Sequence, residues 1–128
     1  MPDRFLYEYA VLRIMPRVER EEFINVGVVL YCSSRGFLAC ISEIDSDRLT
    51  AFSPGIDLAE IEDYLGAFRE ICEGNRHCGS PIALLPSASR FRWLTATRST
   101  ILQTSKVHPG LCSDPGETLS RLFMQQVK

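Results

Sequence analysis

The sequence predicts an α+β fold with two layers, in which helices pack on a mainly antiparallel sheet of about four strands. Three observations support this class: an almost uncharged, β-branched run at residues 23–32, a second apolar run after a short turn, and two later segments that begin with strong helix-start signals. A chain of 128 residues suits one core, so we expect one domain over residues 1–128.

The predicted sheet begins with residues 6–14, which are rich in aromatic and β-branched side chains and stop before Pro16, a residue that cannot donate to a sheet ladder. Residues 16–22 form a charged connection, which we expect to run over the surface. Residues 23–32 are apolar at even and odd positions alike. A strand with one exposed face would alternate, so this run predicts a central strand covered on both faces.

After a turn at residues 33–36, residues 37–42 return as a third strand. The hairpin register places Cys32 opposite Phe37 and Cys40 opposite Val29, so the two thiols lie on opposite faces and cannot bridge each other. Both faces of the hairpin are apolar. We therefore expect helices on one face and, on the other, either further helix or a second copy of the chain, which leaves a homodimer as one interpretation.

The next segment predicts helix. Residues 45–52 fit one or two helical turns, and the clearest helix of the chain follows. Asp57 is its N-cap, Glu60 completes a capping box and Gly74 ends it. Its apolar residues share one face: Leu58, Ile61, Leu65, Phe68 and Cys72.

Two more helices are expected in the C-terminal half. Residues 87–94 predict a short helix with Ser87 as its cap and with Phe91 and Leu94 facing inward. Residues 100–104 are a candidate fourth strand. The residues that start the last helix and pack it on the sheet are Asp114, Pro115, Glu117, Leu119, Leu122 and Phe123.

The composition excludes some classes of protein. The 14 basic and 16 acidic residues give a net charge of −2, which provides no overall field for nucleic acid or an anionic membrane. No apolar run approaches the ~20 residues that span a bilayer, and the first residues lack a secretory signal pattern, so we expect a cytoplasmic protein without a membrane partner. The five cysteines are an odd number, and we expect reduced thiols that behave as small buried hydrophobes.

The segment from Arg90 to Cys112, called the basic segment below, differs from the rest of the chain. It contains three arginines, a lysine, a histidine, the one tryptophan and many hydroxyls, and no acidic residue. Guanidinium, ammonium and hydroxyl groups bind phosphate or carboxylate. The predicted anion-binding or ligand-binding residues are Arg92, Arg98, Ser99, Thr100, Gln103 and Lys106. In the alternative, structural interpretation, Arg92 and Arg98 pair with Glu19, Glu21 or Glu22, and Glu22 is the favoured partner.

Catalysis stays open, with two weak candidates. His108 precedes Pro109 and Gly110, which predicts a loop position where its imidazole exchanges protons near neutral pH, and Glu22 is the other candidate for proton transfer. No serine–histidine–aspartate order, phosphate-binding glycine loop or dinucleotide fingerprint is present, so no cofactor is predicted. No metal site is predicted either, because the cysteines and histidines lack the paired short spacing of a zinc site. Trp93 beside Phe91 among arginines is one arrangement that stacks on a nucleic-acid base, but aromatic residues at helical spacing are more often core residues, so we expect Phe91 and Trp93 to pack in the core.

Four blocks of sequence, in this order, resemble a small bacterial family known as a domain of unknown function (number three-zero-three-seven). They are YEYAVLR at 7–13, EFINVGV at 22–28, RFRWL at 90–94 and RSTILQTS at 98–105. The resemblance covers nearly the whole chain, although residues 96–97 depart from the family, which more often has a proline before the arginine of the last block. It implies a single-domain cytoplasmic protein, often encoded beside a kinase-like protein of the HipA type, and it carries no established activity.

Three functional hypotheses follow. The leading one is a non-catalytic protein-interaction or accessory module, with a kinase-like protein as a candidate partner. The alternative is a small enzyme or ligand-binding protein for a phosphate-bearing metabolite or nucleotide. The third is nucleic-acid binding through the basic segment, which predicts a steep dependence of affinity on salt and is disfavoured by the net charge.

Overall fold

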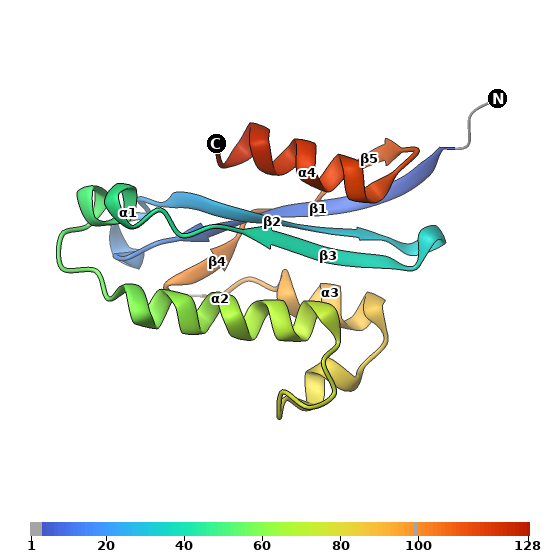
Figure 1. Ribbon diagram of the computed structural model, residues 1–128, viewed down its shortest axis with the longest axis horizontal. Helices are drawn as coiled ribbons and strands as arrows, with labels where there is room; N and C mark the ends of the chain where they lie inside the picture. The colour runs from blue at the N-terminus through green and yellow to red at the C-terminus, as the bar shows by residue number, and fades with distance from the viewer. Residues whose placement is uncertain (1–3, 99) are drawn as a thin grey trace.

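The computed structural model describes residues 4–98 and 100–128. In that part of the chain one antiparallel sheet holds β1 (Phe5–Ile14), β2 (Ile24–Cys32), β3 (Phe37–Ser42), β4 (Leu102–Thr104) and β5 (His108–Cys112). The α-helices are α1 (Ser46–Phe52), α2 (Leu58–Glu73), α3 (Ser87–Leu94) and α4 (Pro115–Gln126), and the 3-10 helices are η1 (Val18–Arg20), η2 (Ser33–Arg35) and η3 (Pro81–Leu84). The predicted α+β class is confirmed (Figure 1).

β1 is the strand around which the sheet is built. β2 pairs with one edge of β1 and β3 extends the sheet beyond β2, whereas β4 and β5 pair with successive stretches of the other edge. Between β4 and β5, the backbone N–H of Ser105 donates to the carbonyl oxygen of Val11 at 2.9 Å, and the Ser105 hydroxyl accepts from the N–H of Val11 at 2.8 Å. The backbone of Val11 is therefore hydrogen-bonded in the gap between β4 and β5.

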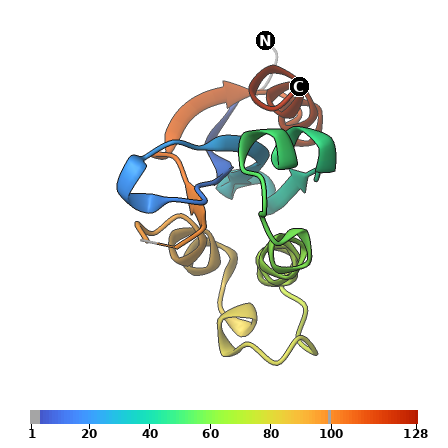
Figure 2. The same cartoon turned by 90° about the vertical axis from the view of Figure 1, so that its left-hand side faces the viewer.

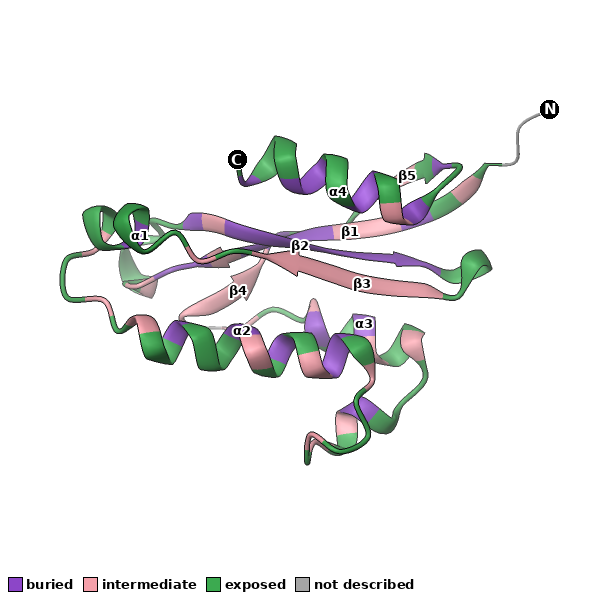
Figure 3. Ribbon diagram, in the orientation of Figure 1, coloured by how far each residue is buried: buried purple, intermediate pink, exposed green. Residues whose placement is uncertain are grey.

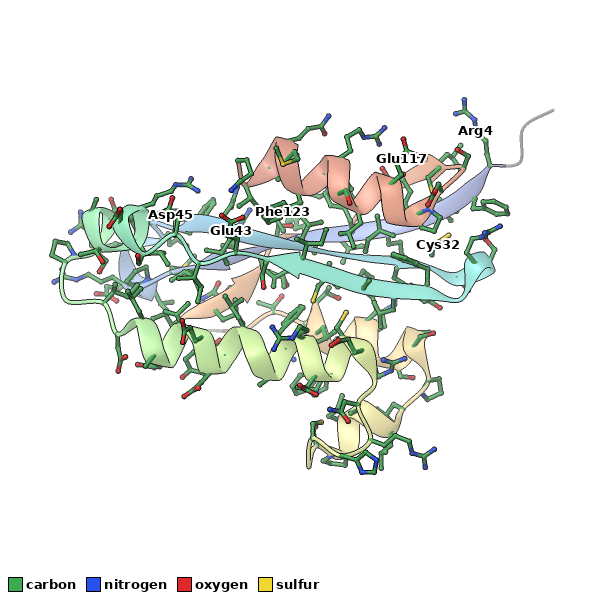
Figure 4. The ribbon with its side chains drawn as sticks, in the orientation of Figure 1. Arg4, Cys32, Glu43, Asp45, Glu117 and Phe123 are labelled. Atoms are coloured by element: carbon green, nitrogen blue, oxygen red, sulfur yellow. The ribbon has the colours of Figure 1, made fainter. Side chains whose placement is uncertain are left out.

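Helices cover both faces of the sheet. α4 packs on one face and α2 and α3 pack on the other, as Figure 2 shows. β2 is buried along almost its whole length, because its alternate side chains enter the two cores (Figure 3). On the α4 side, Phe123 points toward the sheet (Figure 4). The predicted strand with cover on both faces is therefore confirmed as β2, which lies between β1 and β3.

The register of the β2–β3 hairpin is the predicted one. Val29 pairs with Cys40 and Cys32 pairs with Phe37, which places the two thiols on opposite faces. Both faces of the hairpin are apolar, as the sequence indicates. α4 supplies the cover that the second face requires.

The five cysteines are free thiols, and four of them meet in pairs. Cys72 of α2 hydrogen-bonds with Cys40 of β3, and this contact and burial together raise the pKa of Cys72. On the opposite face, burial beside Cys32 raises the pKa of Cys112. A raised thiol pKa keeps the proton on sulfur at neutral pH, so Cys72 and Cys112 pack as apolar groups.

Two helices start with the predicted caps and one does not. The Asp57 carboxylate accepts from the N–H of Glu60 at 3.1 Å, and Asp114 caps α4 in the same way. The prediction that Ser87 caps α3 is wrong. Ser87 is the first helical residue, and Pro86, which has no side-chain acceptor, takes the N-cap position.

β5 is the strand that the sequence pattern does not predict, because Pro109 and Gly110 argue against a strand. The expectation that His108 lies in a loop is therefore wrong: it is the first residue of β5, opposite Tyr9, with 5.4 Å between the two ring centroids. The sheet tolerates Pro109 because β5 is an edge strand. Gly110 is required because a Cβ there would lie 2.4 Å from the ring of Tyr7.

Candidate functional site

The arginines of the basic segment have partners within the chain, beginning with Arg92. Its guanidinium forms a two-pronged pair with the carboxylate of Glu8 on β1, with N–O distances of 2.9 and 3.0 Å. The hydrogen bonds to Glu8 raise the pKa of Arg92. The predicted pairing with Glu22 is wrong, because Glu22 pairs with Arg20 at 2.6 Å in the exposed connection before β2. Arg92 instead joins α3 to β1.

Arg98 closes the end of α3. Its guanidinium donates to the carbonyl oxygen of Leu94 at 3.1 Å and to that of Trp93, and it lies 4.3 Å from the centroid of the Trp93 ring. Burial lowers the pKa of Arg98. Arg90 does the same for α2, where it donates to two carbonyl oxygens of the last turn at 2.8 and 3.1 Å. Cations in these positions satisfy carbonyl groups that a helix leaves without an internal partner.

Of the other predicted binding residues, Thr100 precedes β4, Gln103 lies within it and Lys106 follows it. The Thr100 hydroxyl donates to the carbonyl oxygen of Leu102 at 2.7 Å, and the Gln103 side-chain amide donates to the carbonyl oxygen of Thr100 at 2.8 Å. Lys106 is exposed. Ser99 lies outside the described residues. Thr100 and Gln103 therefore shape the turn that leads into β4.

The two candidates for proton transfer are not brought together. His108 lies opposite Tyr9 on β1, whereas Glu22 lies shortly before Ile24, which pairs with Ile14 near the other end of β1. Tyr9 and Ile14 are five residues apart, or about 16 Å at the rise of a β-strand. His108 and Glu22 therefore cannot act on one reacting group.

An apolar hollow of about 210 Å³ lies between α2, the end of α3 and β4, and is called the α2–β4 groove below. Its lining consists of Tyr64, Ala67, Phe68, Ile71, Trp93, Leu94, Arg98, Thr100, Leu102, Gln103 and Thr104. Three of the residues predicted from the basic segment, Arg98, Thr100 and Gln103, thus meet here with apolar residues of α2 and α3.

Two aromatic side chains on the rim of the groove are exposed. Phe91 is fully buried and stacks on Tyr31, but the expectation that Trp93 packs in the core is wrong, since 41% of Trp93 is exposed. Tyr64, on the outer side of α2, is 40% exposed. Trp93 follows Phe91 by two residues, which turns it about 200° away from the inner side of the helix. This spacing in the sequence contains the signal for its exposure.

A wider hollow of about 560 Å³ lies beside the start of α4, but its lining is charged. Arg4 and Arg121 face it together with Asp114 and Glu117, and Figure 4 labels Arg4 and Glu117. Charged groups stay hydrated unless a partner compensates them, and Asp114 already caps α4. Of these two hollows, the α2–β4 groove is therefore the one in which a bound partner would remove mainly apolar surface from water.

A family described as "Protein of unknown function (DUF3037)" matches residues 9–127. The chain belongs to this family. The DUF3037 match includes every residue that lines the α2–β4 groove. No curated protein and no solved structure matches the chain. None of the helices in the described ranges has the length and apolar character to cross a bilayer, and no three His, Cys, Asp or Glu side chains there are placed to hold a metal ion.

Proposed function

We propose that this DUF3037 protein is a non-catalytic interaction module that binds a partner protein through the α2–β4 groove. The observation that carries the proposal is the pair formed by Trp93 and Arg98: an exposed indole with a guanidinium stacked on it, at the rim of an apolar hollow. A few residues dominate the binding free energy of most protein interfaces, and tryptophan, tyrosine and arginine are enriched among them. Tyr64 supplies the tyrosine at this rim.

The size of the groove favours a protein side chain as its occupant. Pockets that enclose a small-molecule ligand have volumes of about 300–1,000 Å³, and the groove holds about 210 Å³. Burial of one Leu or Phe side chain of a partner would contribute about 1.5–3 kcal/mol. The partner segment is therefore expected to present an apolar residue to Phe68, Ile71 and Leu94.

The rim is also held in place before binding. Arg98 donates to the carbonyl oxygens of Trp93 and Leu94, which fixes the guanidinium under the indole. A side chain that is already ordered loses less conformational entropy when a partner binds. The bonds of Arg98 within the chain thus support a role in presenting Trp93.

The resemblance to the family makes a kinase-like protein encoded nearby the first partner to test. The experiment is a calorimetric titration of that protein with the wild type, with Trp93→Ala and with a control, Phe23→Ala. Phe23 is a matched control because it is 40% exposed and has the guanidinium of Arg13 at 3.9 Å from its ring centroid, yet it does not line the groove.

We expect Trp93→Ala to weaken binding about 30-fold, which corresponds to the loss of about 2 kcal/mol typical of a central interface residue. Phe23→Ala should change the affinity by less than about twofold, within the range of peripheral contacts. Equal losses in the two variants would contradict the assignment of the groove. No measurable binding by the wild type would reject the kinase-like protein as the partner.

The alternative function, binding of a phosphate-bearing metabolite or nucleotide, is favoured by one observation: Arg98, Thr100 and Gln103 line the same groove. Their donors already have acceptors within the chain, so a ligand would have to displace those bonds. A thermal-shift panel of nucleotides, sugar phosphates and inorganic phosphate tests this function. A ligand-specific rise in Tm that is lost in Arg98→Ala would replace the interaction proposal.

A further inference from the structure

The edge of β3 that faces away from β2 is free in the described part of the chain. The N–H of Glu43 donates to the carbonyl oxygen of Val26 at 2.9 Å. Because an antiparallel ladder alternates, the backbone groups of Leu38, Cys40 and Ser42 point away from β2. Edge strands are usually protected from pairing by proline or by charged side chains. β3 contains neither. This edge is therefore open to another strand.

A hollow of about 330 Å³ lies beside this edge, and its lining is Ser42, Ile44, Glu62, Leu65, Gly66 and Arg69. Gly66 lies in the middle of α2, where glycine is less favourable than alanine. A Cβ on Gly66 would meet no atom within 4 Å, so the fold of the single chain does not require a glycine there. A glycine does allow a second backbone to approach α2 closely.

The charges on this side of α2 are self-complementary. Glu62 and Arg69 are seven residues apart, or about two helical turns, with Gly66 between them. If a twofold axis passes beside Gly66, the two copies of α2 run antiparallel, and Glu62 of each copy faces Arg69 of the other. Within the described residues of one chain, the ion-pair contact of Arg69 is a long one to Glu73, with 4.0 Å between Nε and Oε1, and both side chains are 55% exposed. Arg69 is therefore available to a partner.

We infer that a second copy of this chain pairs with the free edge of β3, so that the two sheets join across a twofold axis and the two α2 helices lie side by side. The axis passes near Ser42 and Gly66, which line the same hollow. A second copy of the chain accounts for all three features of this surface. One twofold operation places a second β3 against the free edge, brings a second α2 close to Gly66 and sets Glu62 of each copy opposite Arg69 of the other. This surface lies on the other side of α2 from the α2–β4 groove, so the two proposals are independent.

Sedimentation velocity of the full chain, from low to high micromolar concentration, tests the inference with a charge reversal. Glu62→Arg places two like charges opposite each other and should raise the dimer dissociation constant about tenfold or more. The double variant Glu62→Arg/Arg69→Glu restores the opposite charges and should restore the dimer. Asp63→Arg makes the same change in net charge on the exposed outer side of α2, and we expect it to leave the dimer unchanged.

A second variant separates assembly from folding. Gly66→Arg should block the close approach of the helices and give a monomer. At a concentration where the wild type is also monomeric, the Tm of this variant should equal or exceed that of the wild type, because arginine favours helix more than glycine does. In the wild type, the amides of Cys40 and Ser42, which lie closest to the proposed axis, should exchange more slowly at high concentration than at low concentration. A wild type that stays monomeric, or a Glu62→Arg variant that behaves like Asp63→Arg, would overturn the inference.

Discussion

At the scale of single residues, the arginines of the basic segment donate to two kinds of acceptor. Arg90 and Arg98 donate to carbonyl oxygens at helix ends, whereas Arg92 pairs with a carboxylate, and its own side chain is 60% exposed. A carbonyl at a helix end that loses its donor and cannot reach water costs stability. An exposed ion pair contributes little, because water solvates both groups when the pair is broken.

The two kinds of arginine should therefore differ in their contribution to stability. Arg90→Leu removes three donated bonds, to Ile71, Cys72 and Leu85, and we expect the free energy of unfolding to fall by about 1.5–3 kcal/mol. Arg92→Leu, the matched control, should lower it by less than about 1 kcal/mol. Urea unfolding of both variants at neutral pH measures the difference. Losses of equal size would mean that Arg90 is solvated like Arg92.

At the scale of elements, predictability follows from where the determining residues lie. The apolar period and the caps of α2 and α4 lie within each helix, and the two-sided apolar run of β2 lies within the strand, so these elements could be predicted. β5 depends on β1, which lies at the other end of the chain, and on Tyr7 packing over Gly110. No local pattern contains those contacts, and the local signal of Pro109 points the other way.

The candidate site also combines features that local sequence predicts with features that depend on distant parts of the chain. The residue types of the basic segment indicate binding, and Arg98, Thr100 and Gln103 do line one groove. Their acceptors could not be predicted, because a guanidinium donates equally well to a carboxylate, a phosphate or a carbonyl oxygen. Only the approach of β1 to α3 pairs Arg92 with Glu8 in place of Glu22.

The contact between β1 and β5 yields a prediction of its own. Gly110→Ala places a Cβ against the ring of Tyr7, and overpacking of this kind costs about 1–3 kcal/mol of unfolding free energy. Gly66→Ala is the matched control, because its Cβ meets open space inside a helix and should stabilise the protein by about 0.5–1 kcal/mol. Urea unfolding at a concentration where the chain is monomeric compares them. A Gly110→Ala variant as stable as the wild type would show that β5 shifts away from Tyr7 at little cost.

At the scale of the whole molecule, one sheet separates two apolar cores. Val29 and Tyr31 belong to the core under α2 and α3, and Val28 and Leu30 belong to the core under α4. Each core thus needs the same strand, β2, to be in place. A cavity in one core should therefore lower the stability of the other, because β2 cannot leave one without leaving both.

The single tryptophan makes this coupling measurable. Trp93 lies on the α3 side of the sheet, whereas Leu122 is buried under α4 on the opposite side. Leu122→Ala should lower the free energy of unfolding by about 2–5 kcal/mol, and the urea midpoint should fall equally by Trp93 fluorescence and by far-ultraviolet circular dichroism, as in a two-state transition. Met124→Ala, on the exposed side of the same helix, should change the free energy of unfolding by less than about 0.5 kcal/mol by either signal. If the fluorescence midpoint of Leu122→Ala stays at the wild-type value while the dichroism midpoint falls, α4 unfolds alone and the two cores are independent.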